Sequence, residues 1–284
     1  MPESTSSGAA SPRGRPRPQP AHAVTFVNHG ARLRVEANSA AALNLVSHVL
    51  PVGSRLERLH STDAVFALVV APGGGTGDAP HRLYRDSALL QSSSDLQPLL
   101  KQLESELHFA VASHARSSLF VHAGVVAWRG RTILLPGRSM SGKSSLVAAL
   151  LRAGAEYYSD EYAVIDRQAR VHPYARPLLL RGLEGQLEQA GRQAQGGRVG
   201  TRPLPANLSV STRYSPGQRF EPTVRDASHG LMILIANTVV VRARPHFALD
   251  HLMPVAESAT TLEGVRGEAD DAAAWLLHYR TLDV

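Results

Sequence analysis

The chain has 284 residues, of which 43% are hydrophobic, which is enough for one large domain or two modest ones with packed cores. It has no cysteine, which excludes a disulfide framework, a thiolate nucleophile and a Cys-ligated metal. The net charge of +6 is modest, and aromatic residues are not interleaved with basic ones. We therefore do not expect a nucleic-acid partner. No apolar stretch is long enough to span a membrane and the start lacks a signal-peptide pattern, so we expect a cytoplasmic protein without a membrane partner.

The first part of the chain predicts a tail followed by a small domain. Residues 1–20 are rich in Ser, Pro, Gly and Arg, and we expect them to be a disordered tail. Residues 21–116 predict an α+β module that opens with a hairpin turning at residues 28–30, with His22 and His29 in surface contexts. A short helix, two further strands and a long helix follow in this module.

Residues 117–284 predict a second, α/β domain. It opens with two strands joined by a turn at residues 129–131, and a helix and an acid-bearing strand come next. Residues 182–230 are rich in Gly, Gln, Arg and Pro and weakly periodic, so we expect a long loop that covers a substrate. The remaining segments predict a buried strand at residues 231–241 and closing helices at residues 246–258 and 268–282.

A Gly- and Ser-rich break within this second domain matches GxxxxGK(S/T), the pattern of a phosphate-binding loop. A short apolar strand precedes the break and a helical pattern at residues 144–154 follows it, which is the order that the chemistry requires. In that arrangement successive backbone N–H groups and the helix dipole attract an anion. We therefore expect ATP to be bound by the loop residues Gly137, Arg138, Ser139, Met140, Ser141, Gly142, Lys143, Ser144 and Ser145.

Two side chains of the loop carry specific chemistry. Lys143 would reach the β- and γ-phosphates, and the Ser144 hydroxyl would ligate Mg²⁺. Of the 30 Lys and Arg residues only Lys101 and Lys143 are lysines. Because basic positions in this chain are usually Arg, a Lys inside the loop favours a functional role.

Two acids and a histidine complete the candidate site. Asp160 and Glu161 follow an apolar stretch about sixteen residues after Ser144. If that stretch is a strand beside the strand of the loop, both carboxylates emerge next to the phosphates. One of them could hold Mg²⁺, for which we assign Asp160 together with Ser144, and either could accept a proton from an attacking hydroxyl. His122, in the strand pair before the loop, could face the γ-phosphate.

These residues together resemble a known family. Residues 118–175 are similar to the catalytic domain of the bacterial HPr kinase/phosphorylases, in which a His-containing strand pair precedes the phosphate loop and an acid pair follows its helix. The resemblance is closer to HPr-kinase-like proteins encoded near peptide-tailoring genes. It implies an α/β fold in which a P-loop catalytic domain with a mixed sheet follows the small α+β domain. It also implies that Asp160, Glu161, His122 and Lys143 are catalytic.

The resemblance implies a kinase that uses ATP and Mg²⁺ to phosphorylate a serine on a peptide or protein, and it allows a homo-oligomer. The chain departs from the family at Ser145, where the HPr enzymes carry an acid, and at Glu161, where they carry Asp. Three alternatives therefore stay open. They are a kinase for a small-molecule hydroxyl, a non-catalytic nucleotide-binding interaction protein, and a simple NTPase.

Overall fold

A computed structural model describes residues 20–72, 79–137, 141–175, 178–181, 187–190 and 198–279. The predicted tail before Pro20 and residues 182–186 and 191–197 of the predicted long loop lie outside these ranges. The fold is α/β with mixed sheets, as the sequence indicates. Two compact units divide the chain, the first made of residues 1–26, 33–50 and 58–106 and the second of residues 27–32, 51–57 and 107–284.

The N-terminal part of the chain forms a six-stranded sheet with two helices. The strands run in the order β3-β1-β2-β4-β5-β6, with β2 and β4 parallel and β4, β5 and β6 antiparallel. The elements are β1 (His22–Asn28), β2 (Ala31–Ala37), α1 (Ala40–Ser47), β3 (Arg55–Leu56), β4 (Ala64–Val69), β5 (His81–Arg85), β6 (Ala88–Ser93) and α2 (Leu96–His114).

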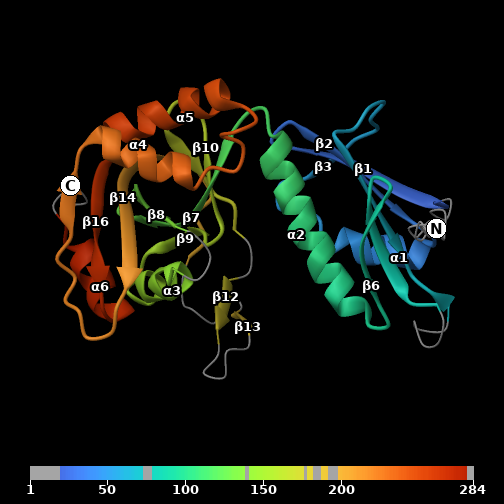
Figure 1. The fold of residues 1–284 in the computed structure, drawn as a ribbon, viewed down its shortest axis with the longest axis horizontal. Coiled ribbons are helices and arrows are strands. Elements are labelled where there is room, and N and C mark those ends of the chain that lie inside the picture. The colour runs from blue at the N-terminus through green and yellow to red at the C-terminus, as the bar shows by residue number, and fades with distance from the viewer. Residues whose placement is uncertain are drawn as a thin grey trace, which may run out of the picture. The chain divides into compact units, whose positions relative to one another are not determined.

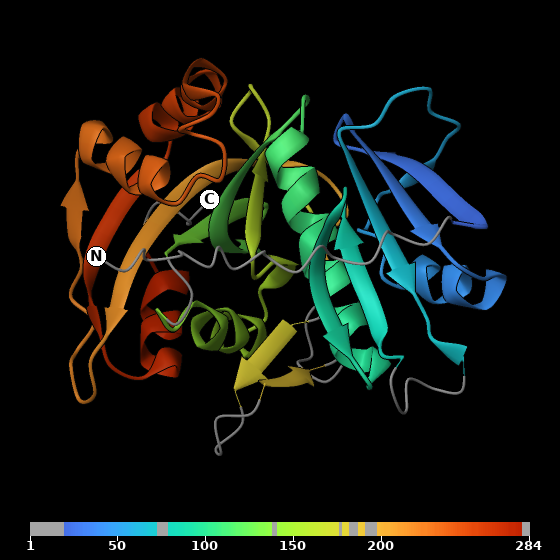
Figure 2. The same cartoon turned by 45° about the vertical axis from the view of Figure 1, so that its right-hand side comes forward.

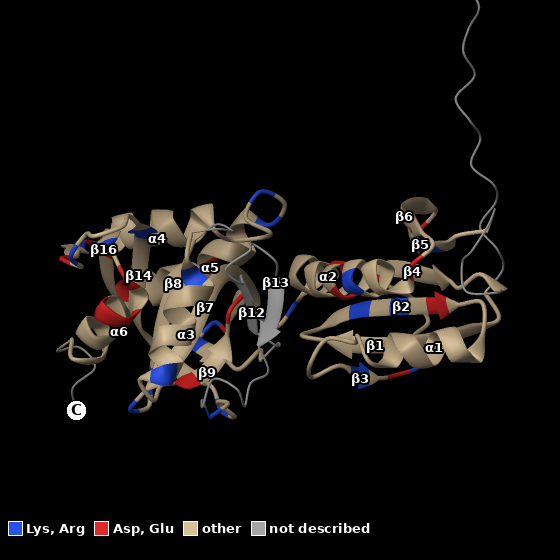
Figure 3. Ribbon diagram, turned by 90° about the horizontal axis from the view of Figure 1, so that it is seen from below, with Lys and Arg blue, Asp and Glu red and all other residues tan. Residues whose placement is uncertain are grey.

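Alternation along these strands separates an apolar core from a charged face. Leu33 and Val35 of β2 and Phe66 of β4 are fully buried. The alternate residues on β2, Arg34 and Glu36, are charged, and Arg34 Nε lies 2.7 Å from Glu36 Oε1. Figure 3 shows this mixture as blue and red segments along β2.

From residue 119 onward, the described part of the second unit contains the larger sheet, a separate two-stranded sheet and four helices. Its elements are β7 (Leu119–Trp128), β8 (Arg131–Pro136), α3 (Lys143–Arg152), β9 (Glu156–Ser159), β10 (Tyr162–Ile165), β11 (Arg170–His172), β12 (Leu178–Arg181), β13 (Leu187–Ala190), β14 (Leu204–Tyr214), β15 (Thr223–Arg225), α4 (Ala227–Ala236), α5 (Pro245–Ser258), β16 (Thr260–Arg266) and α6 (Ala269–Leu277). No helix among the described residues combines the length and apolar character needed to cross a membrane.

The main sheet of this unit is mixed, with the order β11-β10-β7-β8-β14-β16-β15, and β9 pairs with β7 beside β10. Strand β7 is antiparallel to its neighbours β8, β9 and β10. Strands β8, β14 and β16 are mutually parallel, and β14 and β16 lie side by side in both views (Figures 1 and 2). The carboxyl ends of these three strands therefore lie at one edge of the sheet.

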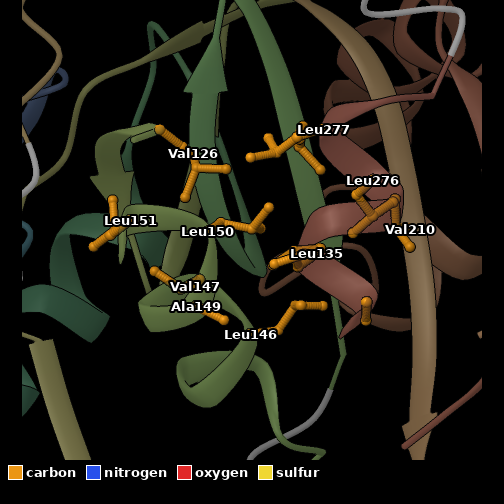
Figure 4. Close-up of a cluster of buried hydrophobic side chains, with 14 of the residues drawn as sticks. Val126, Leu135, Leu146, Val147, Ala149, Leu150, Leu151, Val210, Leu276 and Leu277 are labelled. Atoms are coloured by element: carbon orange, nitrogen blue, oxygen red, sulfur yellow. The ribbon is translucent and has the colours of Figure 1, made fainter. Parts of the chain in front are cut away.

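Helices cover both faces of this sheet (Figure 1). One face, with Val126 and Leu135, packs against α3 and α6, and Figure 4 shows Leu146 and Leu150 of α3 and Leu276 of α6 in this cluster. Residues that alternate with these on β7 and β8, such as Val125 and Leu134, pack against α4 and α5 on the other face. Because successive strand residues point to opposite faces, a continuous apolar run is needed to bury both.

The strand predicted at residues 231–241 is wrong, because α4 occupies the first part of this segment. Asp226 caps the helix by accepting a 2.8 Å hydrogen bond from the His229 N–H, and Gly230 and Leu234 are buried one turn apart. A short apolar run fits both a buried strand and a buried helix, so its periodicity did not separate the two.

The prediction of a single long loop at residues 182–230 is also wrong, because β13, β14, β15 and the start of α4 lie within it. Strand β14 lies at the centre of the sheet, and β15 pairs with β16 at its edge. Alternation is visible in β14, where Leu204, Ala206 and Leu208 are buried. The Pro and Arg residues around this strand hid the pattern. His29 is not in a surface context either, because its ring packs edge-on against Phe120 at 5.3 Å.

Candidate functional site

The candidate phosphate loop connects β8 to α3. Gly142 is the N-cap of α3 and has a left-handed backbone with φ of 86°. A β-carbon on Gly142 would lie 2.5 Å from Nη2 of Arg266, and one on Gly137 would lie 2.9 Å from Oγ of Ser141. Gly142 therefore requires glycine, whereas at Gly137 the added carbon would meet only the Ser141 hydroxyl, which can rotate away. Three of the predicted loop residues lie outside the described ranges: Arg138, Ser139 and Met140.

Lys143 is the first residue of α3, and its side chain folds back over the loop. Its Nζ donates a 2.6 Å hydrogen bond to the carbonyl oxygen of Gly137. Burial lowers the pKa of the Lys143 ammonium, and the negative charges of Asp160 and Glu161 oppose this shift. The ammonium thus lies within electrostatic reach of both predicted acids. Ser144 follows in the first turn of the helix and is half-buried, and the next residue is exposed.

The two acids interrupt a strand. Asp160 and Glu161 separate β9 from β10, and both of these strands pair with β7. The buried Ser159 hydroxyl accepts hydrogen bonds from the N–H groups of Glu161 and of the residue after it, which holds the break in a turn. The Tyr157 hydroxyl donates a 3.1 Å hydrogen bond to Oδ1 of Asp160. The interruption thus presents two adjacent carboxylates in the middle of the sheet.

His122 lies on β7 at the point where three segments meet. Its N–H donates a 2.7 Å hydrogen bond to the carbonyl oxygen of Asn237, which follows α4. Its carbonyl oxygen accepts a 3.2 Å hydrogen bond from the N–H of Gly137, the first residue of the loop. The backbone of His122 is therefore fixed directly to the start of the loop.

The His122 ring lies against Tyr162, with ring centroids 4.8 Å apart. Burial lowers the pKa of the imidazole, Glu161 raises it and Lys143 lowers it. The net direction is downward, so the imidazole is neutral at pH 7 and can accept a proton or a hydrogen bond.

The structure brings four predicted site residues together at the start of the loop: His122, Lys143, Asp160 and Glu161. Several neighbours of these residues were not singled out from the sequence: Tyr157, Ser159, Tyr162, Asn237 and Arg266. Ser159 and Tyr157 precede Asp160 by one and three residues, and this closeness in sequence was the signal that could have marked them as neighbours of the acids. Arg266 ends β16, a strand that the sequence analysis did not predict.

Within the described ranges, no three His, Cys, Asp or Glu side chains gather in a way that could hold a metal ion. Mg²⁺ is commonly bound by one or two protein oxygens, substrate phosphates and waters. The Ser144 hydroxyl and one carboxylate of the acid pair are the side-chain oxygens that could contribute to such a partial set.

We compared the chain with protein-family models and with curated proteins. No family model matches it, and no curated protein matches it.

Proposed function

We propose that this chain is an ATP-dependent phosphotransferase whose second unit is a P-loop domain of the HPr-kinase-like type. It transfers the γ-phosphoryl group of ATP to the serine hydroxyl of a peptide or protein. One observation carries this proposal. The carbonyl oxygen of His122 accepts a 3.2 Å hydrogen bond from the first loop residue, Gly137, and the N–H of the next residue on β7, Ala123, donates a 3.2 Å bond to the carbonyl oxygen of Glu161. These bonds bring the loop with Lys143, the histidine and the acid pair to one place. A phosphate-binding cation and a carboxylate base are the groups that this reaction requires.

In the proposed reaction the serine oxygen attacks the γ-phosphorus, the bond from phosphorus to the β,γ-bridging oxygen breaks, and ADP leaves. The hydroxyl proton passes to a carboxylate of the acid pair. Lys143 and the loop N–H groups neutralise charge on the phosphoryl oxygens. Ser144 and Asp160 would hold Mg²⁺, which would supply further neutralisation of the phosphate charge.

The contacts of the two acids support a division of roles. Asp160 is held by the Tyr157 hydroxyl, which suits a ligand with a fixed position. Glu161 interacts electrostatically with both His122 and Lys143. We therefore assign the proton to Glu161 and the metal to Asp160.

The test is transfer of radiolabelled γ-phosphate from ATP to serine-containing peptides. Wild type is expected to label the peptide in a Mg²⁺-dependent reaction, and Glu161→Gln is expected to bind MgATP but to transfer at least about a hundredfold more slowly. Nucleotide turnover that is independent of any acceptor would instead identify an NTPase. Labelling of a sugar or amino acid in place of every peptide would identify a small-molecule kinase.

One observation favours a second candidate function, which is nucleotide binding without transfer. The residue after Ser144 is Ser145, an exposed serine, at the position where the HPr enzymes carry an acid. If that acid is essential for transfer, this chain binds MgATP and passes the signal to a partner. Calorimetric binding of MgATP with no labelled product from any acceptor would support this candidate and contradict the first.

A further inference from the structure

A buried arginine lies next to the phosphate loop, far from it in sequence. Strand β16 pairs with β14 in parallel, and Arg266 is paired with Tyr214 at the end of both strands. Strand β14 also pairs in parallel with β8, which leads into the loop. The carboxyl end of β16 therefore lies on the same side of the sheet as the loop. Carboxyl ends of parallel strands are where ligands bind in open α/β sheets.

The Arg266 guanidinium contacts the last residue of the loop directly. Its Nη2 donates a 2.8 Å hydrogen bond to the carbonyl oxygen of Gly142, and Nη1 donates a 2.9 Å bond to the carbonyl oxygen of Gly267. The Gly142 backbone packs so closely on Nη2 that it leaves no room for a β-carbon. Arg266 thus supports the left-handed turn from which α3 begins.

Arg266 retains a hydrogen-bonding group that is not used by the described residues. The side chain is 2% exposed, and its Nε is buried without a hydrogen-bond partner in the part of the chain that the structure describes. A buried N–H group without a partner is costly, and a bound acceptor would remove that cost. The guanidinium therefore has capacity to stabilise an acceptor at the loop.

The charge of Arg266 is only partly offset by its neighbours. Burial lowers its pKa, and Tyr214 and Glu268 oppose that shift. Glu268 is exposed and accepts a 3.2 Å hydrogen bond from the Tyr214 hydroxyl, so solvent weakens its effect on the guanidinium. Arginine remains protonated even when buried. A positive charge that is buried at the loop and incompletely balanced favours an anion there.

We propose that Arg266 is a positioning residue for the nucleotide. It holds Gly142 in the phosphate-binding conformation and supplies buried positive charge that stabilises the bound triphosphate. This inference rests on the proposed nucleotide site and extends it, because it assigns the C-terminal strand β16 a direct part in nucleotide affinity.

The test uses two neutral replacements and one matched control in the full chain. Arg266→Met keeps an apolar side chain as far as the position of Nε, and Arg266→Gln places an amide N–H near that position. Both variants lack the charge and the Nη2 donor that bonds Gly142, and having two gives a second chance of a folded protein. Arg225→Met removes the same charge from β15, where Arg225 is exposed and paired with Glu263 at 2.9 Å. Calorimetric titrations with MgATP and with magnesium tripolyphosphate give dissociation constants, and thermal melting gives the stability of the protein without nucleotide.

We expect each Arg266 variant to raise the Kd for MgATP and for tripolyphosphate about tenfold or more, and Arg225→Met to leave both unchanged. The melting temperature without nucleotide should fall modestly, since two hydrogen bonds to backbone carbonyls are lost, and the Kd is therefore measured at a temperature where each variant is folded. A folded Arg266 variant with the Kd of wild type would overturn the inference and would assign Arg266 a structural role. If wild type binds both ligands but transfers no phosphate, the phosphotransferase proposal fails and this inference stands. If wild type binds neither ligand, both fail.

Discussion

The hydroxyl of Tyr157 donates a hydrogen bond to Oδ1 of Asp160, and the two residues lie on either side of Ser159, which holds the strand break between β9 and β10. The Tyr157 side chain is otherwise packed in the core between β9 and α3, where it is 2% exposed. A core residue therefore fixes the orientation of a site carboxylate.

Replacing this tyrosine tests whether the orientation matters. Tyr157→Phe keeps the buried ring but removes the hydrogen bond to Asp160, and we expect turnover to fall about threefold to tenfold, the effect of one lost hydrogen bond. Steady-state kinetics of phosphate transfer provides the measurement. Tyr84→Phe, at a buried tyrosine of the first unit, should leave turnover unchanged. Equal rates for wild type and Tyr157→Phe would show that the hydrogen bond from Tyr157 to Asp160 does not contribute to turnover.

The two lysines of the chain provide a matched pair. Lys143→Ala removes the ammonium that bonds Gly137, and we expect MgATP affinity to fall about a hundredfold, because charge-assisted bonds to phosphate are lost. Lys101→Ala changes an exposed lysine on α2 and should leave the affinity unchanged. Titration calorimetry on both variants distinguishes these results. A Lys143→Ala protein that binds MgATP like wild type would show that the loop is not the nucleotide site.

Gly142 combines a left-handed backbone with close contact to Arg266. Gly142→Ala should lower the free energy of unfolding by more than about 1 kcal/mol, because it adds a clash to the backbone strain. Gly217→Ala is the control, since Gly217 also has a positive φ of 72° but has no atom within 4 Å of the added carbon. Urea denaturation measures both. We expect only Gly142→Ala to impair MgATP binding as well, and equal losses of stability in both variants would argue against the clash.

The buried imidazole of His29 should make the free energy of unfolding depend on pH. Burial, assisted by the neighbouring His172, lowers the pKa of His29 from 6.5 to about 4. Between these values the unfolded chain binds the proton and the folded chain does not. Stability is therefore retained above pH 6.5 and falls as the pH decreases toward 4, by about 3 kcal/mol at most from this group.

His29→Asn separates this contribution from those of other groups. His29 has a positive φ of 47° in the turn before Gly30, and Asn tolerates that conformation. The variant should lose stability at pH 7, because the ring contacts with Phe120 disappear, but its stability should depend less on pH between 6.5 and 4. Denaturation at several pH values measures this slope. An unchanged slope in His29→Asn would assign the acid sensitivity to other groups.

Local signals allowed much of the fold to be predicted from the sequence. The Asn28-His29-Gly30 turn, the Arg129-Gly130 turn and the helix after Gly142 all depend on residues adjacent in the chain, and all three are present. Prediction was wrong where the environment decides between alternatives. The apolar run from Leu231 became helical because Asp226 caps it and α5 packs against it.

The candidate site shows the same contrast. The loop motif and the acid pair could be recognised because each is contiguous in sequence. Arg266 could not, because its proximity to Gly142 arises from the pairing of β16 with β14 and of β14 with β8. Nothing in the local pattern around residue 266 indicates which loop it approaches.

The hydrogen bond from Arg266 to Gly142 joins residues that are 124 positions apart in the chain. During synthesis, which proceeds from the N-terminus, the loop and α3 emerge long before the arginine that supports them. Contacts between distant residues also form slowly, because a long loop must close first. A nascent chain therefore cannot complete this support for the loop until β16 has left the ribosome and paired with β14. The proposed competence to bind nucleotide would then depend on completion of the sheet.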